Sequence, residues 1–194
     1  MSFTIEDGVL KKYNYEEQEE TVVIPEGVKV IAMHAFVDCR KVKHVSIPNT
    51  VQEIGIAAFG NSGIEDIVVP DSVTKLDSSV FRDCSRLKSA VIGNGVTELG
   101  DRLFSSCQEL VHLELPSGLK KVGSRAFLEC YSLQKVWVDG TEYWISGNDV
   151  PKPVQLVFDS LEEIRDKIRY DYENGLMDEF EYVDYQIAGD GYSY

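Results

Sequence analysis

The 194-residue sequence lacks the features by which several large classes of protein are recognised. It has no apolar run near the roughly 18 residues that a helix needs to cross a bilayer, so membrane insertion is not expected. Lys and Arg total 19 against 33 Asp and Glu, which gives a net charge of −14. Contacts to nucleic-acid phosphates require the opposite sign of charge. We therefore expect no nucleic-acid partner.

The first residues also lack the charged and then apolar stretch of a secretory leader. Taken as a full-length chain, the sequence predicts a cytoplasmic protein. If a leader has been removed, it predicts a cell-surface or secreted protein.

Recognisable catalytic and cofactor-binding motifs are absent as well. The chain has no phosphate-binding loop, no His-Glu-x-x-His, no nucleophile elbow and no dinucleotide fingerprint. It also lacks the paired Cys-x-x-Cys ligands of common metal sites. We therefore expect no cofactor, no metal site and no enzymatic activity.

The dominant feature of the sequence is a repeat. Five phenylalanines recur at intervals of 22 or 23 residues: Phe36, Phe59, Phe81, Phe104 and Phe127. Apolar residues hold the same phase around them, as Ile24, Ile47, Val69, Ile92 and Leu115 do. A fixed period of about 20–29 residues is the signature of a solenoid, in which successive coils stack on one another.

One repeat illustrates the expected coil. Residues 110–115 alternate, with Leu113 and Leu115 predicted to point inward and His112 and Glu114 outward, as in a half-buried strand. Pro116 ends that strand, because proline donates no ladder hydrogen bond. A second short extended piece follows, and then a compact helical turn that carries the Phe. Each coil should thus add one strand to a parallel sheet and a turn-rich back.

The four cysteines follow the repeat too. Cys39, Cys84, Cys107 and Cys130 each stand three residues after a repeat Phe, and Ser62 fills the remaining slot. Stacked coils would bring neighbouring cysteines to about 5 Å, within reach of a disulfide. Equivalent side chains point the same way, however, and free cysteine is one of the most buried residue types. We predict a column of buried thiols, with a disulfide or a metal site as alternatives.

This frame resembles the leucine-rich repeats of the bacterial surface-antigen, or BspA-like, class over about residues 1–145. One coil matches the class pattern at Leu87, Ala90, Ile92, Val96, Leu99, Gly100, Phe104 and Cys107. The resemblance implies a right-handed leucine-rich-repeat β-solenoid whose concave strand face binds proteins or surface ligands. It also implies a cell-surface habitat.

Three parts follow from these patterns. Residues 1–20 should form an N-terminal cap, a β-hairpin around Asp7-Gly8. Residues 21–150 should form five clear coils and a degenerate sixth, in which Ile145 is still in phase. Residues 151–194 should form a C-terminal cap: a closing strand at 154–158, a helix from the capping box at Ser160 to about Gly175, and an acidic aromatic tail. The helix either covers the last coil or docks a partner.

Candidate binding residues occupy two outward rows of the predicted sheet. The first row is His44, Asp66, Ser89, His112 and Lys135, and the second is Ser46, Val68, Val91, Glu114 and Trp137. Trp137 is the favoured contact, because interface hot spots are enriched in tryptophan. The alternative is that the C-terminal segment covers it. A hydrolase triad is disfavoured, because Ser89 lies between Asp66 and His112 and the histidine should stand in the middle.

The sequence therefore predicts a non-enzymatic module that binds a protein or peptide along its concave face. The predicted contacts are Trp137, Lys135, His112, Glu114, Val91, Val68, Ser89, Asp66 and His44. One alternative is a regulator or decoy that attracts a basic partner through residues 159–194, which carry eleven acids and three bases. A hydrolase is the remote alternative. The sequence does not predict the oligomeric state.

Overall fold

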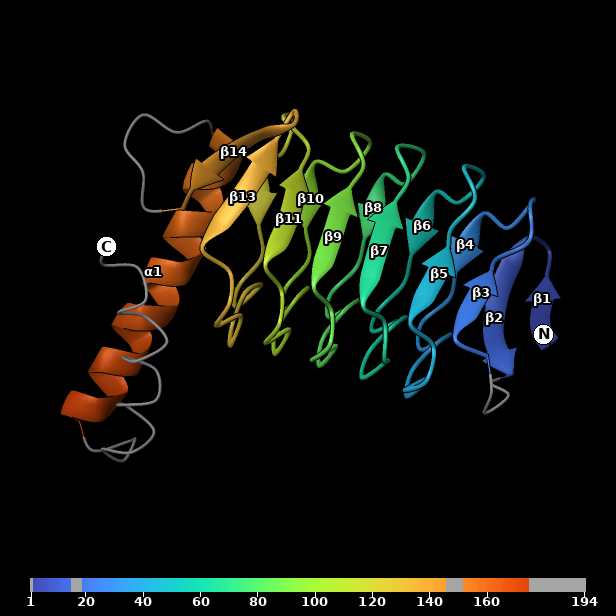
Figure 1. Ribbon diagram of the computed structural model, residues 1–194, viewed down its shortest axis with the longest axis horizontal. Coiled ribbons are helices and arrows are strands. Elements are labelled where there is room, and N and C mark those ends of the chain that lie inside the picture. Colours follow the sequence, from blue (N-terminus) through green and yellow to red (C-terminus); the bar gives the residue numbers. More distant parts are fainter. Residues whose placement is uncertain (1, 15–18, 146–151, 175–194) are drawn as a thin grey trace.

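Short strands with alternating burial build the front sheet of the solenoid. The computed structural model describes residues 2–14, 19–145 and 152–174, and its coils stack side by side in sequence order (Figure 1). The front sheet comprises β3 (Thr21–Val23), β5 (His44–Ser46), β7 (Asp66–Val69), β9 (Ser89–Ile92), β11 (His112–Leu115), β13 (Lys135–Val138) and β14 (Thr141–Trp144). From β3 to β13 the strands are parallel, and residues one repeat apart are partners, as Asp66 and Ser89 are. The predicted stacking of coils is confirmed.

The second extended piece of each coil forms a sheet of its own, the back sheet. Its strands are β1 (Ser2–Glu6), β2 (Val9–Asn14), β4 (Val30–Ile31), β6 (Glu53–Ile54) and β8 (Lys75–Leu76). A two-stranded pair continues the same side, namely β10 (Glu98–Leu99) and β12 (Lys121–Val122). The coils of the solenoid thus add parallel strands to the front sheet on one side and to these two sheets on the other, with turns between them.

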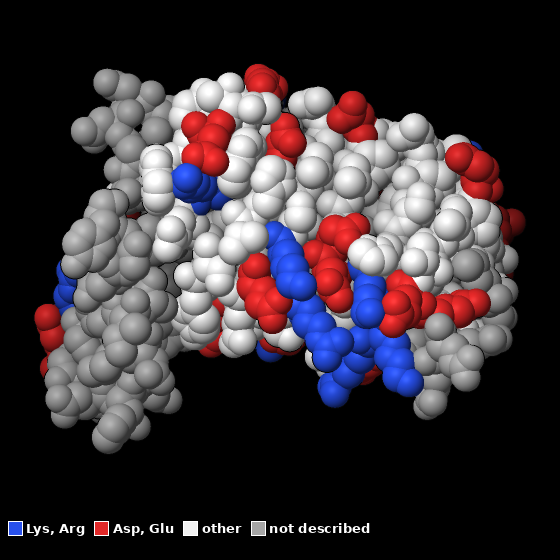
Figure 2. Space-filling view, viewed as in Figure 1, with Lys and Arg blue, Asp and Glu red and all other residues white. Residues whose placement is uncertain are grey.

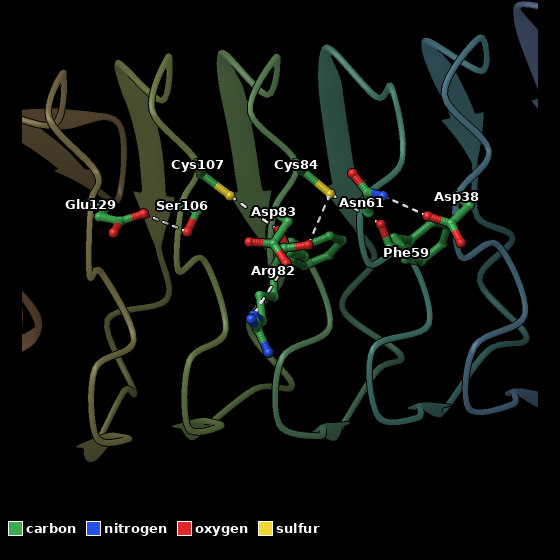
Figure 3. Close-up of polar contacts among 10 residues, drawn as sticks. Asp38, Phe59, Asn61, Arg82, Asp83, Cys84, Ser106, Cys107 and Glu129 are labelled. Atoms are coloured by element: carbon green, nitrogen blue, oxygen red, sulfur yellow. Dashed lines mark hydrogen bonds and ion pairs between the residues drawn. The ribbon is translucent and has the colours of Figure 1, made fainter.

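The side that carries the Phe column is a run of turns rather than the compact helical turn expected. Two residues per coil have positive φ, and they form two columns: His34, Ala57, Ser79, Arg102 and Arg125, then Asp38, Asn61, Asp83, Ser106 and Glu129. Left-handed residues break a helix and let alternate N–H groups reach the next coil, as Phe36 N donates to Ala58 O at 2.7 Å. Side chains of the second column also join coils: Asn61 Nδ2 donates to Asp38 Oδ1 at 2.5 Å (Figure 3).

The repeat phenylalanines form a continuous ladder in the core. Their rings stack with centroid separations of 4.9, 5.7, 5.3 and 5.9 Å along the series. Tyr13 extends the ladder by stacking on Phe36 at 5.1 Å. All six side chains are at most 2% exposed. The Phe period is therefore explained by packing alone.

The cysteines are four free, buried thiols, which confirms the predicted thiol column. Cys84, Cys107 and Cys130 each donate from Sγ to the carbonyl of a Phe one coil earlier, at 3.0, 3.1 and 3.1 Å, and Figure 3 shows part of this column. Burial raises the pKa of the Cys84 thiol to about 11 and raises those of Cys107 and Cys130 further. The column is part of the scaffold.

The shorter second coil closes around a glycine. A Cβ added at Gly63 would lie 1.9 Å from the carbonyl oxygen of Arg40 in the previous coil. Only glycine permits this approach, which lets the coil omit one residue. Gly93, in the column otherwise held by proline, is similarly crowded, with the carbonyl carbon of Pro70 at 2.5 Å from an added Cβ.

The N-terminal hairpin forms as predicted. β1 and β2 pair antiparallel, and Asp7 and Gly8 both have positive φ, at 50° and 76°. This geometry suits the tight turns that match strand twist. β2 then pairs parallel with β4, so the hairpin continues the back sheet past the first coil.

The sixth coil ends differently from the prediction. After β13 the chain turns at Asp139-Gly140, where φ is 51° and 71°, and returns as β14 antiparallel to β13. Ile145 is buried, but it follows a hairpin strand and not a second leg of a coil. Val150, noted at a Phe-like position, lies outside the described residues.

The predicted closing strand at 154–158 is wrong, because these residues belong to the helix α1 (Lys152–Glu173). Ser160 therefore lies inside the helix and does not cap it. Val154 and Val157 are fully buried, and α1 contacts β12 and β13 at the end of the solenoid. The first turns of α1 thus cover the last coil, as the cap interpretation proposed, and the helix then runs past the coils (Figure 1).

Candidate functional site

The structure brings the two predicted rows together on the outer face of the front sheet. In the first row His44 pairs with Asp66, Asp66 with Ser89, and Ser89 with His112. In the second row Val68 pairs with Val91, Val91 with Glu114, and Glu114 with Trp137. The register follows from the repeat, because equal offsets in neighbouring coils become partners.

The C-terminal end of this face holds a set of contacting side chains. We call His112, Glu114, Lys135, Trp137, Glu142 and Trp144 the tryptophan cluster. The rings of His112 and Trp137 lie with centroids 4.2 Å apart, tilted by 42°. Lys135 Nζ lies 4.2 Å from the centre of the Trp144 ring and 2.7 Å from Glu142 Oε1. Gly140 N donates to Glu114 Oε1 at 3.2 Å.

These contacts are made within the chain, without a partner. The cation over Trp144 and the carboxylate beside it hold Lys135 in one place, which is a charge-assisted arrangement on an aromatic face. Trp137 has the His112 ring on one side and Glu142 as its cross-strand partner. Trp137 is half-buried in this setting, and Trp144 remains 47% exposed.

Sequence reasoning missed Glu142 and Trp144. Both belong to β14, whose existence depends on the Asp139-Gly140 turn. The signal was available, because Asp-Gly followed by an alternating strand is typical of a hairpin. Tyr143 is half-buried against the core, and its neighbours Glu142 and Trp144 are exposed.

An uncharged band continues from the cluster across the earlier coils. Val68 is 59% exposed and Val23 is 54% exposed, in the same row as Ser46 and the half-buried Val91. Figure 2 shows this face as a largely uncharged area with acidic and basic side chains alternating along its lower border. Two ion pairs join neighbouring coils on that border: Lys43 lies 2.8 Å from Glu20, and Lys88 lies 3.2 Å from Glu65.

The row of His, Asp and Ser does not have the arrangement of a catalytic triad. His44 Nδ1 lies 2.5 Å from Asp66 Oδ2, so the aspartate is engaged on the side away from Ser89. His112, on the other side of Ser89, stacks against Trp137. The His44 and Asp66 side chains are 49% and 53% exposed, in a setting with little desolvation to activate a nucleophile.

Metal-binding clusters and membrane-spanning helices are both absent from the described part of the chain. Residues 2–14, 19–145 and 152–174 contain no group of three or more His, Cys, Asp or Glu side chains arranged to hold a metal ion. Within the same ranges, no helix combines the length and the apolar character needed to cross a membrane.

A parallel solenoid with coils of about 23 residues and an apolar stripe of this pattern has the architecture of a leucine-rich repeat protein. A sequence profile for the BspA type leucine rich repeat region matches residues 9–134 in six copies. The chain belongs to this family. The matched region begins within β2, in agreement with the position of Tyr13 in the aromatic ladder.

Solved structures of bacterial proteins have the same fold. A leucine-rich repeat protein of T. pallidum is 32% identical, with a TM-score of 0.61, over 66% of this chain and 62% of that one. One from Bacteroides ovatus is 27% identical, with a TM-score of 0.62, over 68% of this chain and 36% of that one. The chain therefore spans less than two thirds of either protein. A search of curated proteins gives no match.

Proposed function

We propose that this protein is a non-enzymatic binding module that engages a protein or peptide through its front sheet, with the tryptophan cluster as the centre of the contact. Membership of a leucine-rich repeat family supports an interaction role. The observation that carries the proposal is the exposed Trp144 next to the half-buried Trp137, held by Lys135 and His112 at the end of an uncharged band.

The cluster has the properties expected of an interface hot spot. Tryptophan offers a large apolar contact area, and hot spots are enriched in it. Because Lys135 and His112 already contact the two indole rings, part of the side-chain ordering that binding requires is made in advance. Val68 and Val91 extend the apolar contact along the sheet. His44, Asp66 and Ser89 supply the polar positions beside them.

The proposal is tested by selecting peptides from a displayed library on the full chain and measuring their affinity for variants. We expect Trp137→Ala and Trp144→Ala each to weaken binding at least about tenfold, the loss typical of a hot-spot residue. Tyr170→Ala is the matched control, since Tyr170 is also an exposed aromatic residue, at 58%, but lies on α1. The proposal fails if the selected peptides lose affinity with Tyr170→Ala and keep it with both tryptophan variants.

The acidic-tail alternative is separated by the same assay. That alternative concerns residues 159–194, of which 159–173 belong to α1 and 175–194 lie outside the described residues. A chain cut after residue 174 should retain the peptides selected on the front sheet, and their affinity should persist near about 0.5 M NaCl, where exposed charges are strongly screened. Loss of binding on truncation and in high salt would instead favour the tail.

A cell-surface location is proposed on the type of repeat alone. Fractionation of the native cells, followed by protease treatment of intact cells, tests it. A protein that resists protease until the cells are broken would rule out exposure at the surface.

A further inference from the structure

The four N-terminal strands of the front sheet carry a charge pattern with an unusual symmetry. Glu20, Lys43, Glu65 and Lys88 each stand one residue before a strand, namely β3, β5, β7 and β9. Their charges alternate, and they form ion pairs within the chain at 2.8 Å (Glu20 with Lys43) and 3.2 Å (Glu65 with Lys88). We call these four residues the front charge row.

An alternating row with an even number of members is complementary to itself when its order is reversed. Placed against a reversed copy, Glu20 faces Lys88 and Lys43 faces Glu65, and both matches occur twice. A two-fold axis that runs parallel to the strands, between β5 and β7, produces this reversal. It also brings the two front sheets face to face with their strands aligned, which is a common way for sheets to pack.

The other outward rows of the same coils obey the same symmetry. In the next row, His44 and Asp66 exchange places under the axis, so each histidine faces an aspartate. In the apolar row Val23 faces Val91, and Val68 faces Ser46; Val23 and Val68 are 54% and 59% exposed. The rotation therefore sets opposite charges against each other and valines against uncharged side chains.

We propose that this face of β3, β5, β7 and β9 binds a second copy of the chain across that two-fold axis. The inference rests on the proposed function in one respect, namely that the front sheet is a protein-binding surface, and it names this chain as one partner. A two-fold interface uses the same patch on both copies, so self-complementarity is the property it requires. The tryptophan cluster begins on the next strand, β11, and continues on β13 and β14, so it stays outside the contact of these four strands.

The back sheet shows why charge alone does not carry the proposal. Glu53 with Lys75, at 2.5 Å, and Glu98 with Lys121, at 3.9 Å, make a similar alternation there. The strands β6, β8, β10 and β12, all within the described residues, present no exposed valine beside these charges. In the front sheet the alternating row lies beside exposed valines of the same four coils, whereas the exposed Ile5 of the back sheet lies on β1, away from the charged row.

The size of the patch sets the strength expected. Four strands about 4.8 Å apart, each contributing about 10 Å of height, give a face of roughly 200 Å². A standard interface buries about 800 Å² on each partner, so the self-association should be weak and rise with concentration. The symmetry predicts which residues control it.

The experiment measures sedimentation velocity of the full chain over a wide range of concentrations, together with Lys43→Glu, Glu65→Lys and their equimolar mixture. Each variant alone places like charges opposite one another at two positions, and we expect its self-association to weaken about tenfold or more. When one Lys43→Glu chain meets one Glu65→Lys chain, positions 43 and 65 again carry opposite charges across the axis, so all four matches are restored. The mixture should therefore associate as the unmodified protein does.

The matched control is the pair Glu53→Lys and Lys75→Glu on the back sheet, and circular dichroism establishes that every variant is folded. The proposal is overturned if the unmodified chain is monomeric at every concentration, if the mixture fails to recover, or if the back-sheet variants weaken association equally. None of these results bears on the tryptophan cluster, since Trp137→Ala should change peptide affinity and leave self-association unchanged. Failure of one proposal is thus distinguishable from failure of the other.

Discussion

Truncation of Phe81 is the most informative test of the aromatic ladder. Phe81 is fully buried, and its ring stacks on Phe59 at 5.7 Å and on Phe104 at 5.3 Å. Phe→Ala in a core costs about 3–5 kcal/mol, and stacked aromatic pairs add about 0.5–1.5 kcal/mol each. With two stacked neighbours, we expect Phe81→Ala to lower the free energy of unfolding by about 4–8 kcal/mol, a large share of the about 5–15 kcal/mol typical of a domain.

A milder variant separates ring stacking from cavity formation. Phe81→Leu keeps most of the buried volume but removes two ring contacts, so we expect a loss of about 1–3 kcal/mol. Phe127 has a single ring neighbour in the ladder, Phe104 at 5.9 Å, among the contacts that the structure describes. Phe127→Leu should therefore cost about half as much as Phe81→Leu.

Urea unfolding followed by far-ultraviolet circular dichroism measures these losses, and the fluorescence of Trp137 and Trp144 reports separately on the last coil. The reasoning is refuted if Phe81→Ala costs less than about 2 kcal/mol. It is also refuted if Phe81→Leu costs no more than Phe127→Leu, because the number of stacked neighbours would then not matter.

Three further outcomes are expected. Gly63→Ala should lower the free energy of unfolding in urea by at least about 2 kcal/mol, because the added Cβ would lie 1.9 Å from a backbone oxygen. Gly118→Ala is the control and should be neutral, because an added Cβ there has nothing within 4 Å. Equal effects of the two variants would contradict the close-approach explanation. Because α1 buries Val157 against the last coil, Val157→Ala should lower the free energy of unfolding by about 2 kcal/mol. An unchanged urea midpoint would show that the helix does not pack on the core. Burial raises the pKa of the Cys84 thiol to about 11 from 9.0. Between these two pH values the thiol is protonated in the folded chain and ionised in the unfolded chain. Stability should fall as pH rises above about 9, by about 1.4 kcal/mol per buried thiol at pH 10, and a Cys84→Ser variant that shows the same fall would contradict this.

Much of the fold was predictable because a solenoid converts sequence period into spatial neighbourhood. The Phe and Cys columns and the outward rows follow from equal offsets in successive coils. The run of turns was not predictable, because its left-handed positions are held by Asn61 and Asp83 but also by Ala57 and Arg102. Residues of such different propensity leave no common signal.

The C-terminal errors have a different cause. Val154, Leu156 and Phe158 alternate as a strand would, but Val154, Val157 and Leu161 also share one face of a helix. A short apolar segment satisfies both periods, and only its continuation into α1 decides between them. The hairpin after β13 was missed because Ile145 stands in phase with the repeat.

Part of the candidate site was predictable from the sequence and part was not. Its rows were predicted from register, whereas its contacts depend on the hairpin that carries Glu142 and Trp144. The packing of Lys135 on Trp144 joins residues on two antiparallel strands, which a repeat period does not place together.

Hydrogen exchange of the full chain, free and bound to a peptide selected on it, tests partner binding by the front sheet most directly. We predict slower exchange on binding in β11, β13 and β14, centred on Trp137, with β8, β10 and β12 unchanged. Protection confined to the back-sheet strands or to α1 would contradict it.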